Sequence, residues 1–186
     1  MARSGLETEL KFAVADLAMV RGRLQAIGAT SLRPPVFEEN VLYDDAEGSI
    51  GRRHELLRVR RSDDVRLTWK QPVRDPRFKV RREVEVRVDD FEAMSAILEG
   101  LGYRPVRRYQ KEREAWHWRD AEILLDRTPI GAFVEIEAQP DEIEAAAAAL
   151  GLDVAQGLTA SYLTIYAAYC RERGLEPGDM VFDDER

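Results

Sequence analysis

LETELKF, at residues 6–12, places Glu7, Glu9 and Lys11 at alternate positions of one short stretch. Side chains alternate across a β-strand, so the three charged groups point to one face and the apolar residues point to the other. The same alternation returns in REVEVRV (82–88) and FVEIEAQ (133–139), whose carboxylates are Glu83, Glu85, Glu135 and Glu137. A single strand of this kind is typical of a solvated surface, but three of them predict one shared polar enclosure.

Basic residues occupy other predicted strands in the same way. LLRVRR (56–61), RLTWK (66–70) and YQKERE (109–114) each carry cations on one face, and these are Arg58, Arg60, Lys70, Lys111 and Arg113. A further strand over residues 121–126 ends at Asp126. Some predicted strands thus carry acidic residues on one face and others carry basic residues, and their opposite charges favour a common interior for both.

Helical periodicity follows the strands. Asp16 and Asp90 are predicted N-caps, and the apolar residues behind each end at Gly28 and Gly102 with the same spacing. Two further helices are predicted near residues 143–150 and 159–173. Helices need apolar strand faces to pack against, and each charged strand offers one. We therefore predict an α+β fold in which a closed sheet turns its apolar faces outward under the helices and encloses a polar tunnel.

Electrostatics indicates what such a tunnel would bind. Close pairs of carboxylates repel by about 1–4 kcal/mol, and hard divalent cations such as Mg²⁺ or Mn²⁺ relieve that repulsion because they prefer oxygen ligands. Arginine grips phosphate oxygens with a fork of donors, and lysine acts as a point charge. Carboxylates that bind a metal ion, beside basic residues that hold phosphate, are the groups that phosphoryl-transfer enzymes use.

Composition narrows the class of protein. The 186 residues are 45% hydrophobic and 34% charged, with a net charge of −7, which argues for a globular chain and against nucleic-acid or anionic-membrane partners. The single cysteine, the lack of a long apolar run and the lack of a signal peptide favour a cytoplasmic location. We expect one domain over residues 1–174, an unstructured tail over 175–186 and an exposed loop over 71–80.

Other chemistries lack support in the sequence. His54 and His117 lie far apart without a second ligand at zinc spacing. No Ser-His-Asp constellation and no Walker-type glycine loop is present. The tyrosines of the last predicted helix are expected to be packing residues.

The ordered set of charged residues resembles the CYTH superfamily, also called triphosphate tunnel metalloenzymes. The resemblance covers about residues 6–169 and includes Ser161-Tyr162-Leu163 in the last helix. It implies an eight-stranded antiparallel tunnel that binds a small-molecule triphosphate with Mg²⁺ or Mn²⁺. It also allows a homodimer. One departure is that no lysine follows Lys111, although several members carry a basic residue near the C-terminus.

The resemblance implies a role for each charged residue. The catalytic group would comprise Glu9, Lys111 and Tyr43, with the lysine and tyrosine matching a pair that activates water in some members. Phosphates would be held by Lys11, Arg58, Arg60, Lys70, Lys111 and Arg113. Metal would be held by Glu7, Glu9, Glu83, Glu85, Asp126, Glu135 and Glu137.

Three activities stay open at this point. Attack by water on the terminal phosphorus would make the protein a triphosphatase, which we favour because Arg58 and Arg60 resemble that branch. Attack by the 3′-hydroxyl of ATP on the α-phosphorus would make it a class IV adenylyl cyclase. A non-catalytic binder of polyphosphate or nucleotide is the third reading, although pure polyanion binding would favour fewer carboxylates.

Overall fold

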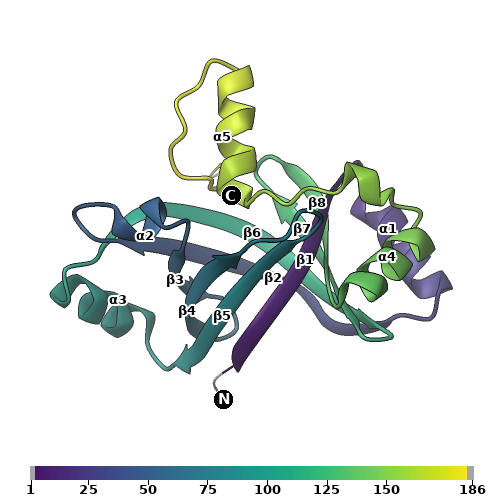
Figure 1. The fold of residues 1–186 in the computed structure, drawn as a ribbon, viewed down its shortest axis with the longest axis horizontal. Helices are drawn as coiled ribbons and strands as arrows, with labels where there is room; N and C mark the ends of the chain where they lie inside the picture. Colours follow the sequence, from purple (N-terminus) through teal and green to yellow (C-terminus); the bar gives the residue numbers. More distant parts are fainter. Residues whose placement is uncertain (1–2, 184–186) are drawn as a thin grey trace.

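A closed antiparallel barrel forms the centre of the molecule (Figure 1). The structure, a computed structural model, describes residues 3–183. Within them, eight strands close in the order β1-β5-β4-β3-β2-β6-β7-β8, which confirms the predicted fold class. The strands are β1 (Arg3–Val14), β2 (Thr30–Asp44), β3 (Leu56–Arg61), β4 (Val65–Val73), β5 (Lys79–Val88), β6 (Arg104–Trp118), β7 (Ala121–Thr128) and β8 (Gly131–Glu137).

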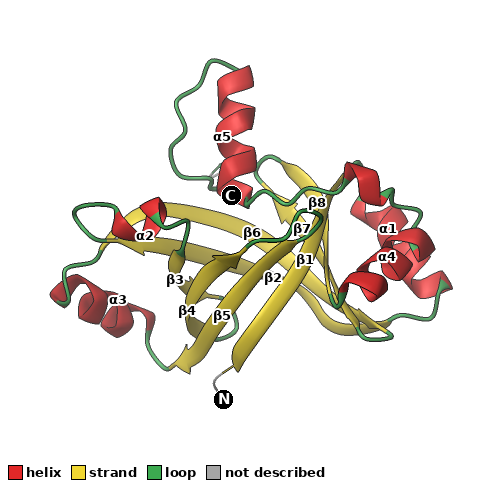
Figure 2. Ribbon diagram, viewed as in Figure 1, coloured by secondary structure: helices red, strands yellow, loops and turns green. Residues whose placement is uncertain are grey.

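Helices lie around the outside of the barrel (Figure 2). They are α1 (Leu17–Ala26), α2 (Ser49–Arg52), α3 (Phe91–Gly100), α4 (Pro140–Ala149) and α5 (Tyr162–Glu172), with a 3-10 turn, η1, at Val154–Gln156. The predicted caps are present: Asp16 accepts from the Ala18 amide and Asp90 from the Ala93 amide. Gly28 and Gly102 end the first and third helices at φ +74° and +92°, a conformation that glycine adopts without strain.

Several strands are longer than predicted. β2 begins at Thr30 rather than near Asn40, and register shifts on either side of Arg33 mark β-bulges that accommodate Pro34 and Pro35. β6 is one continuous strand. The expected exposed loop over 71–80 is correct in part: residues 71–77 are exposed and 74–78 lie outside the strands, whereas 71–73 end β4, 79–80 begin β5 and Phe78 is buried in the core. Proline and charge content hid the strand pattern at both places.

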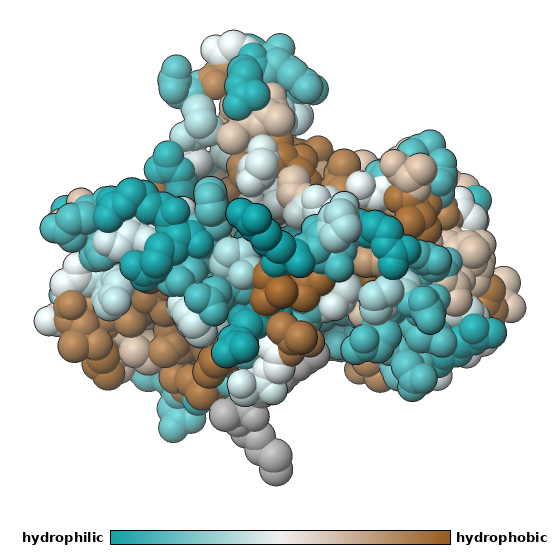
Figure 3. Space-filling model, viewed as in Figure 1, coloured by the Kyte–Doolittle hydropathy of each residue, from teal (hydrophilic) through white to brown (hydrophobic). Residues whose placement is uncertain are grey.

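The apolar cores lie outside the barrel wall, as predicted. Leu10 and Phe12 of β1 pack with α1 and α4 in the largest cluster, and Val59 of β3 packs under Leu98 of α3 in another. The cover is incomplete on the outer face of β1 and β5, where Leu6 is 67% exposed. Figure 3 also shows a hydrophobic area around α3, where Ile97 and the C-cap residue Leu101 are exposed.

The C-terminal segment is docked on the barrel, which corrects the expected unstructured tail as far as residue 183. Met180 is fully buried, and its amide donates to the Arg108 carbonyl while its own carbonyl accepts from the Gln110 amide. The Tyr166 hydroxyl of α5 donates to the Asp179 carbonyl. Residues 184–186 of the predicted tail lie outside the described part of the chain.

The segment before α5 is tied to β1. Lys11 and Leu158 exchange two backbone hydrogen bonds, and a Cβ at Gly157 would stand 2.6 Å from the Leu10 side chain. Glycine is therefore required for this close approach. Within residues 3–183, none of the helices has the length and apolar character needed to cross a membrane.

Candidate functional site: a charged tunnel

The barrel encloses a cavity of about 430 Å³ lined mainly by charged side chains. Alternation along each strand puts them there, because residues of one parity on β1, β3 and β8 face inward while the other parity faces the helices. Twelve of the predicted site residues line this cavity: Glu7, Glu9, Lys11, Arg58, Arg60, Lys70, Glu83, Glu85, Lys111, Arg113, Glu135 and Glu137. The structure thus brings together residues from across the chain.

Three carboxylates form a cluster where β1 meets β8. One oxygen from each of Glu7, Glu9 and Glu137 lies within 4.8 Å of the others. Glu7 is paired with Lys70 at 2.6 Å and Glu9 with Lys79 at 2.6 Å, whereas Glu137 forms no ion pair within the described part of the chain. Burial, together with the charges of Glu7 and Glu9, raises the pKa of Glu137 to about 8.

This cluster fits a divalent cation. Its donors are oxygen atoms, which Mg²⁺ and Mn²⁺ prefer, and its excess negative charge is relieved by a cation. The raised pKa of Glu137 reflects that excess negative charge, because a proton neutralises this carboxylate more readily when its neighbours are also negative.

The other four predicted metal ligands are engaged by cations. Glu83 lies 3.2 Å from Lys70, and Glu85 accepts from Arg66 at 2.7 Å. Glu135 pairs with both Lys11 and Arg113. Asp126 is fully buried and accepts from Lys111, Arg113 and the Tyr162 hydroxyl. These carboxylates hold the basic residues in position in this structure.

Cations crowd on the β3 side of the tunnel. Burial and the neighbouring charge of Arg58 lower the pKa of Arg60, and its Nε atom is buried without a hydrogen-bond partner in the described chain. Arg58 donates to the hydroxyls of Tyr109 and Thr68 at 3.1 and 3.2 Å. A guanidinium destabilised in this way is a ready partner for an anion.

Tyr43 does not reach the tunnel, so the structure does not bring the predicted pair of Tyr43 and Lys111 together. Tyr43 lies on the outer face of β2, packs beneath α3 and donates to the Ser95 hydroxyl. Its neighbour Leu42 faces the cavity instead. The one-residue offset reverses the face, because side chains alternate along a strand.

Two other tyrosines contribute to the tunnel lining. Burial and the charge of Asp126 raise the pKa of Tyr162 well above its ordinary value, so its hydroxyl stays a donor to that carboxylate. Burial opposes ionisation of Tyr109, but Arg58 and Lys111 outweigh it and lower its pKa. Tyr109 is therefore the more acidic tyrosine, two residues from Lys111 on the same strand face.

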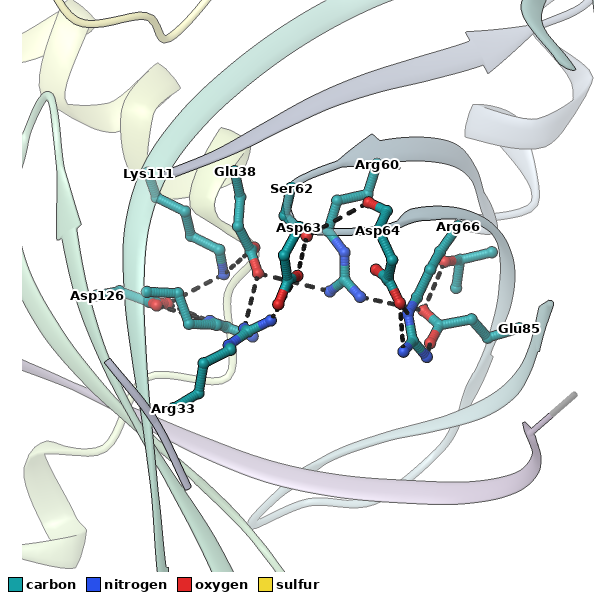
Figure 4. Close-up of polar contacts among 12 residues, drawn as sticks. Arg33, Glu38, Arg60, Ser62, Asp63, Asp64, Arg66, Glu85, Lys111 and Asp126 are labelled. Carbon is teal, nitrogen blue, oxygen red and sulfur yellow. Dashed lines mark hydrogen bonds and ion pairs between the residues drawn. The ribbon is translucent and has the colours of Figure 1, made fainter. Parts of the chain in front are cut away.

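The sequence prediction missed several charged residues of the site. Glu38 is completely buried, and although burial opposes its ionisation, the charges of Lys111 and Arg113 bring its pKa down to about 2. Figure 4 shows Glu38 and Lys111 directed toward one another and Arg33 and Arg60 near them. Lys79 and Arg66 also line the cavity. Extending the alternation back from Asn40 would have revealed Glu38, but the two prolines obscured it.

Comparisons with known proteins identify the fold and the family. A protein of Methanocaldococcus jannaschii named "Putative adenylate cyclase MJ0240" is 29% identical over 140 residues, covering 74% of this chain and 79% of that protein. The structure of a "putative adenylate cyclase" from Vibrio parahaemolyticus matches with a TM-score of 0.77 at 20% identity, over 88% of this chain and 98% of that one.

The Hippeastrum protein HpAC1, a "Putative adenylyl cyclase" described as having a dominant triphosphatase activity, matches with a TM-score of 0.65 at 17% identity. The match covers 90% of this chain and 96% of that one, and it extends the likeness in fold. The CYTH domain itself matches residues 5–162, most of the barrel described above. The chain therefore belongs to the CYTH family.

Proposed function

We propose that this protein is a divalent-metal-dependent triphosphatase that releases the terminal phosphate of a small-molecule triphosphate. One observation carries the proposal: an anion-crowded cluster at Glu137 and a cation-crowded position at Arg60 line the same cavity. A metal–triphosphate complex supplies the missing charge to both. The family membership supports the same substrate class.

Three groups of tunnel residues have different roles in this proposal. Glu7, Glu9 and Glu137 hold Mg²⁺ or Mn²⁺, which neutralises charge on the phosphate oxygens when bound. Lys11, Arg58, Arg60, Lys70, Lys111 and Arg113 hold the phosphates and stabilise charge that builds on the transferring group. Glu83, Glu85, Glu135 and Asp126 keep those cations aligned.

Lys111 keeps its proposed catalytic role, but its tyrosine partner becomes Tyr109. The hydroxyl of Tyr109 faces the tunnel beside Arg58, and its lowered pKa favours the phenolate, the form that can accept a proton from an attacking water. Tyr162 serves to position Asp126 beneath Lys111 and Arg113.

The second candidate is a class IV adenylyl cyclase, which the name of the Methanocaldococcus jannaschii relative favours. The same cations would hold ATP, and its 3′-hydroxyl would attack the α-phosphorus. A protein that recognises polyphosphate without turnover is the third candidate. Its weakness is the carboxylate cluster, which would repel a polyanion in the absence of metal.

Product analysis distinguishes these candidates. Purified protein is incubated with inorganic triphosphate, thiamine triphosphate or ATP, each with Mg²⁺ and with Mn²⁺. Orthophosphate release that stops on chelation of the metal supports the triphosphatase. Cyclic AMP with pyrophosphate supports the cyclase instead, and tight binding without product supports the binder.

A further inference from the structure

Arg33 reaches the tunnel from a distorted part of β2. Register shifts fall between Ser31 and Arg33 and again between Arg33 and Val36, and two prolines occupy the positions between. A bulge re-aims the side chain it carries, and proline is tolerated in a strand at such a place. Arg33 consequently lines the cavity together with Arg60 and Arg66.

The two arms of the Arg33 guanidinium have unlike partners. Its Nη2 lies 3.4 Å from Glu38 Oε1, on a carboxylate with no exposed surface. Its Nη1 lies 3.2 Å from Asp63 Oδ1, on a side chain that is 55% exposed in the turn between β3 and β4. Figure 4 shows Arg33 extended toward both carboxylates. One arm is anchored inside the tunnel and the other is held at its rim.

The neighbouring aspartate of the turn is held differently. Asp64 accepts from both the Nε and Nη2 atoms of Arg66, whose remaining arm bonds Glu85 at 2.7 Å. Asp64 is mostly buried, with 18% of its side chain exposed. That pair closes the hairpin, whereas Asp63 accepts from the Ser62 hydroxyl and forms with Arg33 the kind of exposed ion pair that contributes little to stability.

We infer that Arg33 is a further binding residue for the anionic substrate and that Asp63 holds its outer arm only while the tunnel is empty. The inference rests on the proposed function. Glu38 keeps the guanidinium directed inward, and a phosphate oxygen of the substrate replaces the Asp63 carboxylate on Nη1. A charge-assisted hydrogen bond to phosphate in a partly buried site is stronger than the exposed contact that it replaces.

The test measures binding of the imido analogue of inorganic triphosphate with Mg²⁺ by titration calorimetry, so that no turnover is needed. Arg33→Gln weakens binding by about tenfold, the loss of one charge-assisted hydrogen bond. Asp63→Asn tightens binding by about threefold, because the Nη1 arm of Arg33 no longer has to leave a carboxylate. The same substitution has no effect on affinity when it is combined with Arg33→Gln. The matched control is Arg127→Gln with Glu112→Gln, a pair on the outer face that leaves binding unchanged.

The following results would overturn the inference or the proposed function. If Asp63→Asn tightens binding equally with and without Arg33, the effect is a general loss of negative charge and the inference fails. Unchanged affinity of Arg33→Gln also overturns it. Should that variant not fold, Arg33→Lys replaces it and weakens binding, since an ammonium cannot span Glu38 and the ligand. Wild-type protein that binds no analogue and turns over no triphosphate overturns the proposed function itself.

Discussion

Two carboxylates on adjacent strands of the same tunnel meet opposite surroundings. Asp126 on β7 is surrounded by donors from Lys111, Arg113 and Tyr162, so its charge is satisfied within the protein. Glu137 on β8 faces Glu7 and Glu9, and its pKa rises to about 8. In the proposed function, carboxylates whose charge is satisfied within the protein maintain the barrel, while those crowded by like charge bind the ligand.

The strongest test of this comparison removes a charge from the carboxylate cluster around Glu137. Glu9→Gln keeps the size of the side chain but removes a metal ligand, so turnover falls by about 10²–10³-fold while the circular dichroism spectrum stays unchanged. Glu112→Gln, on the outer face of β6, is the control and retains wild-type turnover. A normal rate for Glu9→Gln would remove Glu9 from the metal site.

Removing a charge from the satisfied side should act on stability instead. Asp126→Asn removes the carboxylate nearest to Lys111 and one of the two that pair with Arg113, which costs about 3–5 kcal/mol of the free energy of unfolding. Urea denaturation followed by fluorescence measures the loss. Wild-type stability in this variant would show that the network does not hold the tunnel wall together.

The two tyrosines sharpen the comparison between the inner and outer faces of the barrel. Tyr109→Phe lowers kcat by about 10²-fold, because it removes the proposed proton acceptor beside Lys111. Tyr43→Phe removes only the bond to Ser95 and costs about 1 kcal/mol of stability with kcat unchanged. Steady-state kinetics of both variants would contradict the assignment if Tyr43→Phe were the slower enzyme.

A further test is the pH dependence of the stability of the metal-free protein. Glu137 holds its proton in the folded state up to about pH 8, whereas the unfolded chain releases it near the ordinary value of 4.5. Between these values the folded state binds more protons, so the free energy of unfolding falls as pH rises. Thermal unfolding from pH 5 to 8 shows this slope, and Glu137→Gln or added Mg²⁺ flattens it. An equal slope in the variant would assign it to another group.

Much of this site could be predicted because it depends on alternation alone. A charged residue at every second position fixes a shared face, so Glu7, Glu9 and Lys11 lie together on one side of the sheet. The apolar positions between them required helices outside, and α1 and α3 were located by their aspartate caps. The closed barrel follows from those two requirements.

Alternation along the sequence does not predict the site where tertiary contacts determine the strand register or the partners of a side chain. Pro34 and Pro35 interrupt the pattern, so Arg33 and Glu38 were not recognised as tunnel residues. Tyr43 was placed on the wrong face by one position. The pairing of Asp126 with cations, as opposed to a metal, depends on which strands become neighbours, and this information is not contained in any single stretch of sequence.

The proposed function requires Glu7, Glu9 and Glu137 to bind a divalent cation and the basic residues around Arg60 to bind a triphosphate. A crystal structure with Mn²⁺ and the imido analogue of inorganic triphosphate tests it directly through anomalous scattering. The expected result is a manganese peak among these three carboxylates, with phosphate density reaching Arg60. Manganese bound outside the barrel, with no phosphate density in the tunnel, would contradict it.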